Sequence, residues 1–141
     1  MIRSILIVDD ESSDRYIASR MVRKAGLTAD IHEFANGEEA LQFILTRDEF
    51  RRACPSPSTT LLFVDINMPR MGGFEFIERL EAAVEGGVVN SACVALMVFS
   101  SSLSPLDRKR AQSFRIVNGY IVKPLSVESV QQVIEGLTAQ A

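Results

Sequence analysis

The chain has 141 residues, of which 47% are hydrophobic and 23% are charged, and its formal net charge at pH 7 is -3. This length suits one domain with a buried core, and we expect residues 1–141 to form that single domain. Without a basic excess, neither nucleic acid nor an anionic membrane surface is expected as a partner. The longest apolar stretches are strand-sized and end at charged residues, glycine or proline, which predicts a cytoplasmic protein without a membrane span or secretory signal.

The two cysteines, Cys54 and Cys93, lie far apart in the sequence. Neither belongs to a C-x-x-C spacing or lies near a second group of metal ligands. The sequence therefore predicts no disulfide framework and no zinc site, and we expect both cysteines to be unreactive thiols.

The first third of the chain alternates strand and helix patterns. Residues 5–8 are a run of large apolar side chains typical of a buried strand, and apolar residues then recur at helical spacing from Ser12 until Gly26. Residues 31–34 alternate apolar and polar side chains, which is typical of an edge strand. A strand, a helix and a second strand in this order indicate a βαβ unit.

The next helix is expected to begin after Asn36, which suits an N-cap because Glu39 follows three positions later, as in a capping box. We expect this helix to continue toward Arg52. Residues 54–58 are polar and contain two prolines, so they predict a connecting loop. The remaining elements are, in chain order, a strand at 61–64, a helix at 74–84, a strand at 94–99, a helix that begins at Ser104-Pro105, a strand at 119–122 and a helix at 127–137.

Five strands that alternate with five helices predict an α/β fold with a doubly wound parallel sheet. Because the polar strand at 31–34 suits an edge, the expected strand order is 2-1-3-4-5, the flavodoxin-like arrangement.

Four of these strands are followed by side chains that can take part in chemistry. Asp9 and Asp10 follow the first strand, Asp65 the third, Ser100 the fourth and Lys123 the fifth. Because ligands bind at the carboxyl ends of strands in such sheets, we expect these groups to meet at one rim. Each group alone could be a cap or a solvated surface residue, but four compatible strand ends favour one site.

Three carboxylates in one place repel each other unless a cation offsets their charge. Mg²⁺ prefers hard oxygen ligands and binds through one or two carboxylates together with phosphoryl oxygens. Asp9, Asp10 and Asp65 therefore predict a magnesium site, where Lys123 and Ser100 could each contact an incoming phosphoryl group. Asp65 is the candidate nucleophile.

The chain resembles the receiver domain of bacterial two-component response regulators. The resemblance covers nearly the whole chain and rests on Asp9-Asp10, on Asp65 to Pro69 with Gly72-Gly73, on Ser100, and on Gly119 to Pro124. It implies the receiver fold and a signalling protein, not an enzyme, that catalyses only its own phosphotransfer and autodephosphorylation. The loops at 55–58 and 86–91 also resemble those of stand-alone receivers that serve phytochrome-like sensor kinases.

By this resemblance, Asp65 accepts a phosphoryl group from a phosphohistidine on a sensor histidine kinase or a histidine phosphotransfer protein. The cofactor is Mg²⁺, which Asp10 and Asp65 bind directly, Asp9 binds through water and Asn67 binds through its main-chain carbonyl. Lys123 pairs with the phosphoryl group.

The resemblance also implies a switch. Ser100 moves to hydrogen-bond the phosphoryl group, and Tyr120 then turns inward and remodels the face formed by the fourth helix, the fifth strand and the fifth helix. Serine replaces the more frequent threonine at position 100, and Ser101 is an alternative hydroxyl.

The signal is expected to leave through a protein surface. The fourth helix is basic, with Arg108, Lys109 and Arg110, and we expect it to bind a partner or to form a phosphorylation-dependent homodimer. A solvated helix face is the alternative.

Three other functions stay open. A haloacid-dehalogenase-type phosphohydrolase also uses an aspartate nucleophile and Mg²⁺, but it needs a second aspartate where this chain has Asn67. A flavodoxin-like cofactor carrier needs a phosphate loop rich in hydroxyl groups and glycine where this chain has Asp9-Asp10-Glu11. A receiver-shaped interaction module that is never phosphorylated has no need for the complete acidic set.

Overall fold

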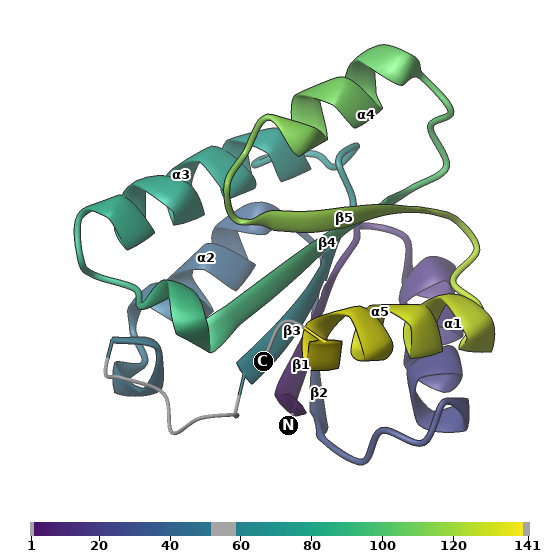
Figure 1. Ribbon diagram of the computed structural model, residues 1–141. Coiled ribbons are helices and arrows are strands. Elements are labelled where there is room, and N and C mark those ends of the chain that lie inside the picture. Colours follow the sequence, from purple (N-terminus) through teal and green to yellow (C-terminus); the bar gives the residue numbers. More distant parts are fainter. Residues whose placement is uncertain (1, 52–58, 140–141) are drawn as a thin grey trace.

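The computed structural model describes residues 2–51 and 59–139 and contains a parallel five-stranded sheet (Figure 1). The strand order β2-β1-β3-β4-β5 confirms the predicted doubly wound topology. The strands are β1 (Ile2–Val8), β2 (Asp30–Phe34), β3 (Thr59–Val64), β4 (Val94–Ser100) and β5 (Val117–Val122).

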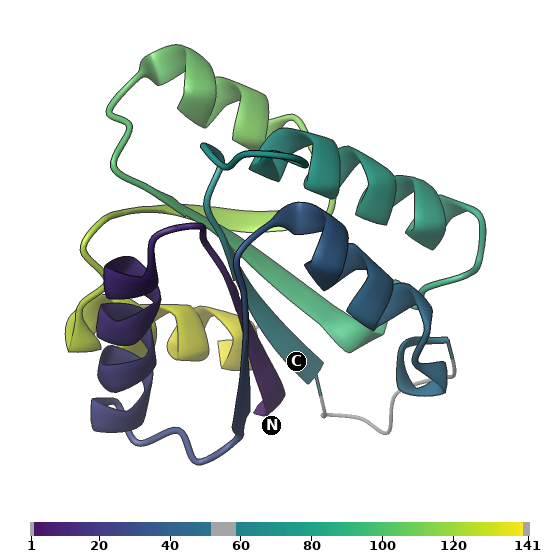
Figure 2. The ribbon, with the colours of Figure 1, turned by 180° about the vertical axis from the view of Figure 1, so that it is seen from behind.

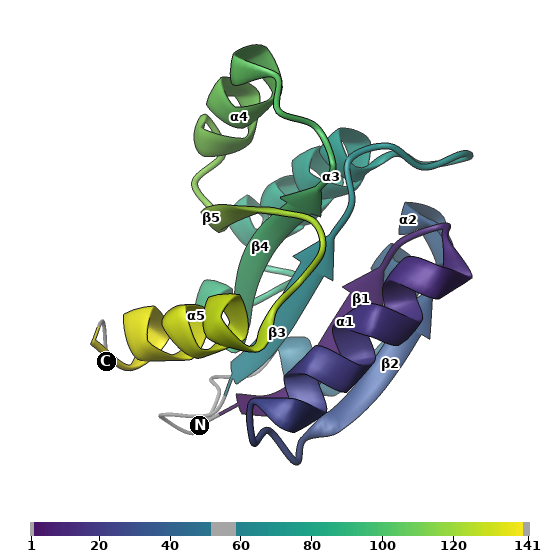
Figure 3. The ribbon, with the colours of Figure 1, turned by 90° about the vertical axis from the view of Figure 1, so that its right-hand side faces the viewer.

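In the described part of the chain, five α-helices cover the two faces of the sheet (Figures 2 and 3). One face carries α1 (Ser12–Lys24) and α5 (Val127–Ala139), and the other carries α2 (Gly37–Leu45), α3 (Gly73–Glu85) and α4 (Pro105–Gln112). This arrangement is the one that right-handed parallel crossovers produce around a sheet.

The apolar strands divide their side chains between two cores. On β1, Leu6 and Val8 pack toward α2 and α3, whereas Ile5 and Ile7 pack toward α1 and α5. Because alternate residues of a strand point to opposite faces, a central strand that is buried on both sides needs an uninterrupted apolar run. This requirement explains the runs at 5–8 and 61–64, all of whose residues are fully buried.

Two of the predicted helix starts are confirmed. The side chain of Asn36 accepts a hydrogen bond from the Glu39 amide at 2.9 Å, and the side chain of Ser104 accepts one from the Asp107 amide at 3.4 Å. These bonds satisfy amide groups that the first turn of a helix leaves without a partner. Pro105 occupies the first turn of α4, as predicted.

The predicted extension of the second helix toward Arg52 is wrong. The helix α2 ends at Leu45, and a short 3-10 helix η1 (Asp48–Phe50) follows. Phe50 is fully buried in the core beside α2 and α3. Burial of this aromatic side chain favours a change of chain direction over continuation of the helix. The predicted loop at 54–58 lies outside the described residues.

Cys93 is disulfide-bonded, so the predicted absence of a disulfide and the expectation of an unreactive thiol are both wrong for this residue. It lies in a second 3-10 helix, η2 (Ser91–Cys93), and is fully buried. Cys54 lies outside the described residues. Within residues 2–51 and 59–139, none of the helices has the length and apolar character needed to cross a membrane.

Candidate functional site

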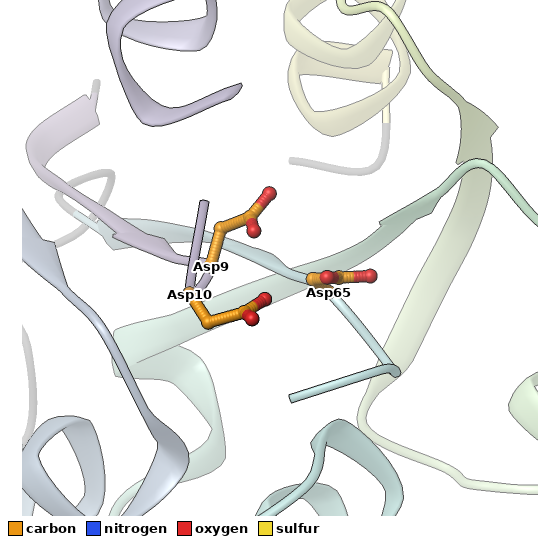
Figure 4. A group of neighbouring side chains, drawn as sticks. All are labelled: Asp9, Asp10 and Asp65. Carbon is orange, nitrogen blue, oxygen red and sulfur yellow. The ribbon is translucent and has the colours of Figure 1, made fainter. Parts of the chain in front are cut away.

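Three carboxylates meet at the carboxyl edge of the central strands (Figure 4). Asp9 and Asp10 follow β1, and Asp65 follows β3. The two strands are parallel neighbours in a register that pairs Val8 with Val64, so the residues that come next are also adjacent. One oxygen from each carboxylate lies within 4.8 Å of the others, as the sequence predicted.

The environments of the three acids differ. Asp9 is fully buried and Asp65 is 5% exposed, whereas Asp10 is partly exposed. Amide groups help to hold the buried pair, because the Glu11 amide donates to Asp9 at 3.0 Å and the Asn67 amide donates to Asp65 at 3.4 Å. Asp10 therefore has the easiest access to solvent, whereas Asp9 and Asp65 are both buried.

Lys123, which follows β5, places its ammonium group against the acids. Its Nζ lies 2.6 Å from Asp9 Oδ2, 2.9 Å from Asp14 Oδ2 and 3.5 Å from Asp65 Oδ2. The side chain is 11% exposed, and the Nζ also lies 4.9 Å from the centroid of the Phe99 ring. Three carboxylates around one mostly buried ammonium offset the cost of burying its charge. The peptide bond between Lys123 and Pro124 is cis.

The crowded charges change two acid–base equilibria. The pKa of the Asp65 carboxyl is raised from its ordinary 3.8 to about 6, mainly because the carboxyl is buried. Lys123 lowers this pKa and Asp9 raises it, and both effects are included in that value. Burial lowers the pKa of Lys123, but hydrogen bonds to Asp9 and Asp14 outweigh burial, and the net pKa is raised. Lys123 is therefore a permanent cation, whereas the charge on Asp65 is unfavourable without a further cation.

Ser100 and Tyr120 are joined through Ser102, a contact that the sequence did not reveal. Ser100 is fully buried, and its Oγ accepts a hydrogen bond from the Ser102 amide at 3.0 Å. The Tyr120 hydroxyl donates to the Ser102 carbonyl at 3.1 Å. Ser101, the alternative hydroxyl, is exposed. The loop after β4 thus links the two predicted switch residues.

Two further residues shape the site. The sequence pointed to Gly73 only as part of the motif that carries the resemblance, and it did not point to Asp14. Gly73 begins α3 so close to β3 that a side chain there would overlap the main-chain carbonyl of Asp65. Asp14 lies in the first turn of α1 and contacts Lys123. An acid in a helix turn that directly follows Asp9 and Asp10 was the available signal for Asp14.

The donor atoms of the acidic cluster are all oxygens, so the cluster could hold a hard divalent cation. A cation bound to Asp10 and Asp65 would offset the charge that makes ionised Asp65 unfavourable. Asn67 lies two residues after Asp65 in the loop that follows β3. The cluster thus combines a buried carboxylate, a permanent cation and a metal-compatible set of ligands.

A doubly wound parallel sheet of this strand order defines the flavodoxin-like class of folds, in which ligands bind at the carboxyl ends of the strands. Within that class, residues 5–135 match the family model of the response regulator receiver domain. The chain belongs to this family, which confirms the resemblance and places the chain in two-component signalling.

Individual relatives agree with this membership. The chain is 27% identical over 131 residues to a chemotaxis protein CheY homolog of Campylobacter jejuni, an alignment that covers 93% of this chain and 88% of the relative. The crystal structure of a two-component response regulator from Cytophaga hutchinsonii has a TM-score of 0.80, 23% identity and 96% coverage of both chains. The bacteriophytochrome response regulator AtBRR has a TM-score of 0.71 and 20% identity, with 98% and 94% coverage. At these identities the two structures support the fold alone.

Membership in the receiver family also bears on the alternatives. Receiver domains are signalling proteins, so membership in this family does not support a phosphohydrolase or a cofactor carrier.

Proposed function

We propose that residues 1–141 act as one receiver domain in which Asp65 accepts a phosphoryl group from a phosphohistidine on a sensor histidine kinase or a histidine phosphotransfer protein. The observation that carries this proposal is the position of Asp65, whose carboxylate lies beside Asp9 and Asp10 and 3.5 Å from the Lys123 ammonium. The cytoplasmic location and a placement among receivers of phytochrome-like kinases stay predictions.

The chemical step is a displacement at phosphorus. An Asp65 carboxylate oxygen attacks the phosphorus atom, the bond between phosphorus and the donor imidazole nitrogen breaks, and its electron pair stays on that nitrogen. Attack by water on the phosphoaspartate later breaks the new phosphorus–oxygen bond and releases inorganic phosphate. The first step uses the ionised form of Asp65, which a neighbouring cation favours, and the second step regenerates that carboxylate.

Mg²⁺ is the cation that we assign to the acidic cluster. Asp10 and Asp65 would hold the ion directly, Asp9 would hold it through water, and Asn67 would contribute its main-chain carbonyl. When bound, the ion offsets negative charge on the carboxylates and on the phosphoryl oxygens. Asp9 is fully buried and already accepts a hydrogen bond from Lys123, which suits an indirect role.

Lys123 and Ser100 are the groups that bind the phosphoryl oxygens. An ammonium and a hydroxyl on neighbouring strand ends can each donate to a different oxygen. When Ser100 turns toward the phosphoryl group, its hydrogen bond from the Ser102 amide is lost. Because Tyr120 donates to the carbonyl of the same residue, movement of this loop would change the position of Tyr120.

The output surface in this proposal is the face formed by α4, β5 and α5. The Arg108 guanidinium lies 5.0 Å from the centroid of the Tyr120 ring, so the switch residue contacts the basic helix directly. Leu103 and Leu106 are 79% and 78% exposed at the start of this helix. Exposed leucines beside arginines are typical of a protein-binding surface, either for a partner or for a phosphorylation-dependent homodimer.

Phosphorylation with a small donor tests the proposal. Incubation with Mg²⁺ and acetyl phosphate should add one phosphoryl group, which intact-mass spectrometry detects and hydroxylamine removes. Asp65→Asn should remain unmodified, while Asp30→Asn, a control at an exposed strand start, should react like the parent protein. Equal modification of Asp65→Asn and the parent would refute the assignment of the phosphoacceptor.

A further inference from the structure

The ammonium group of Lys123 forms its shortest contacts with Asp9 and with Asp14 of α1. Its two short contacts are hydrogen bonds to Asp9 Oδ2 at 2.6 Å and to Asp14 Oδ2 at 2.9 Å, whereas the Asp65 oxygen is 3.5 Å away. Asp14 belongs to the first turn of α1, four residues after Asp10. The ammonium is therefore bound more closely by Asp9 and Asp14 than by Asp65, the proposed phosphoacceptor.

The two acids that hold Lys123 differ in their access to water. Asp9 is fully buried, so loss of the ammonium would leave a buried carboxylate without its cation. The Asp14 side chain is 34% exposed, so water can replace the ammonium there. Of the two contacts, the one with Asp14 is easier to break.

We infer that Asp14 is a positioning residue, which holds Lys123 in the unphosphorylated protein and releases it when a phosphoryl group occupies Asp65. This inference rests on the proposed function. A phosphoryl group carries more negative charge than the carboxylate it modifies and offers three strong acceptor oxygens. An ammonium has three N–H donors, so Lys123 can keep its bond to Asp9 while it exchanges Asp14 for a phosphoryl oxygen.

This exchange makes Asp14 a competitor of the phosphoryl group for Lys123. Its removal should favour the phosphorylated state, because the unphosphorylated protein loses a contact that the phosphorylated protein does not use. Asp14 also connects the site to α1, so that the first turn of this helix contacts Lys123 in only one of the two states.

Beryllofluoride, an anion that mimics a phosphoryl group on an aspartate, provides the test without turnover. We measure its dissociation constant in saturating Mg²⁺ by NMR titration of the full chain. For Asp14→Asn we expect binding that is about threefold to tenfold tighter than for the parent, the range of one partly exposed charged contact. Asp14→Glu, which retains a carboxylate, should bind more nearly like the parent.

Glu128→Gln is the matched control, because Glu128 is also an exposed acid in the first turn of a helix and, among the described residues, forms no ion pair. It should leave beryllofluoride affinity within about twofold of the parent, the scale of a surface charge. Asp14→Asn in a Lys123→Met background separates the contact from a general charge effect. Equal tightening in that background, or unchanged or weaker binding by Asp14→Asn alone, would overturn the inference.

Magnesium affinity distinguishes failure of the inference from failure of the proposed function. If the parent binds no beryllofluoride and is not labelled by acetyl phosphate, the proposed function has failed. The contact between Asp14 and Lys123 is then tested by the Mg²⁺ dissociation constant. Asp14→Asn should raise this constant about threefold when Lys123 is present and should leave it nearly unchanged in Lys123→Met. The same change in both backgrounds would show that Asp14 does not act through Lys123.

Discussion

Replacement of Asp65 by asparagine should stabilise the protein at neutral pH when no divalent cation is present. Asp65 is 5% exposed, and burial raises the pKa of its carboxyl from 3.8 to about 6. That pKa already includes the attraction of Lys123 and the repulsion of Asp9. Loss of the ion pair with Lys123 therefore needs no separate correction.

Proton linkage sets the direction of the effect. A carboxyl with a higher pKa in the folded state binds its proton more tightly there, so its stabilising contribution is complete below pH 3.8 and is lost as the pH rises through about 6. A tenfold change in an equilibrium constant is worth about 1.4 kcal/mol, so ionised Asp65 lowers the free energy of unfolding by about 3 kcal/mol at neutral pH. Asparagine has a similar shape and no charge, and it removes this penalty.

Urea unfolding in EDTA measures the difference. The free energy of unfolding of Asp65→Asn should exceed that of the parent by about 3 kcal/mol near pH 7.5 and by about 1 kcal/mol near pH 4.5. Asp30→Asn is the control at an exposed strand start, and it should change the free energy of unfolding near pH 7.5 by less than about 0.5 kcal/mol. If Asp65→Asn is no more stable than the parent near pH 7.5, or if the difference does not change with pH, the electrostatic account of Asp65 is wrong.

Four further changes, one of them at a glycine outside the site, test the structure. Addition of Mg²⁺ should raise the melting temperature of the parent, because a Mg²⁺ concentration 100 times the dissociation constant stabilises the folded state by about 2.7 kcal/mol. The effect on Asp65→Asn should be much smaller. Equal shifts in melting temperature would argue against a metal site at this residue. Gly73→Ala should lower the free energy of unfolding by about 1–3 kcal/mol because its methyl group would overlap the Asp65 carbonyl. In the same urea assay Gly136→Ala should raise the free energy of unfolding by about 0.5–1 kcal/mol, since a side chain at this position of α5 meets no atom within 4 Å. A loss of stability in Gly136→Ala would show that this position is not open. Ser100→Ala should lower the free energy of unfolding by about 1 kcal/mol because the Ser102 amide loses its acceptor, and a neutral result would show that water replaces the hydroxyl.

Local patterns in the sequence were sufficient to predict the sheet and the members of its rim. An apolar run such as 61–64 predicts a central strand because both faces of such a strand are buried. The strand at 31–34 could be assigned to an edge because it alternates apolar and polar side chains. Strand order then brings Asp9 and Asp65 together, since residues that follow neighbouring parallel strands must be neighbours themselves. Each of these steps depends on a few consecutive residues and a topological rule.

Only the tertiary structure determines which side chains contact one another at the site. Lys123 and Asp14 are 109 positions apart, and no local pattern shows that Lys123 lies closer to Asp14 than to Asp65. The raised pKa of Asp65 likewise results from burial by several separate elements. The end of α2 at Leu45 follows from the space available to Phe50 in the core. Periodicity records which face of an element is buried, whereas contact distances and desolvation depend on how all the elements pack together.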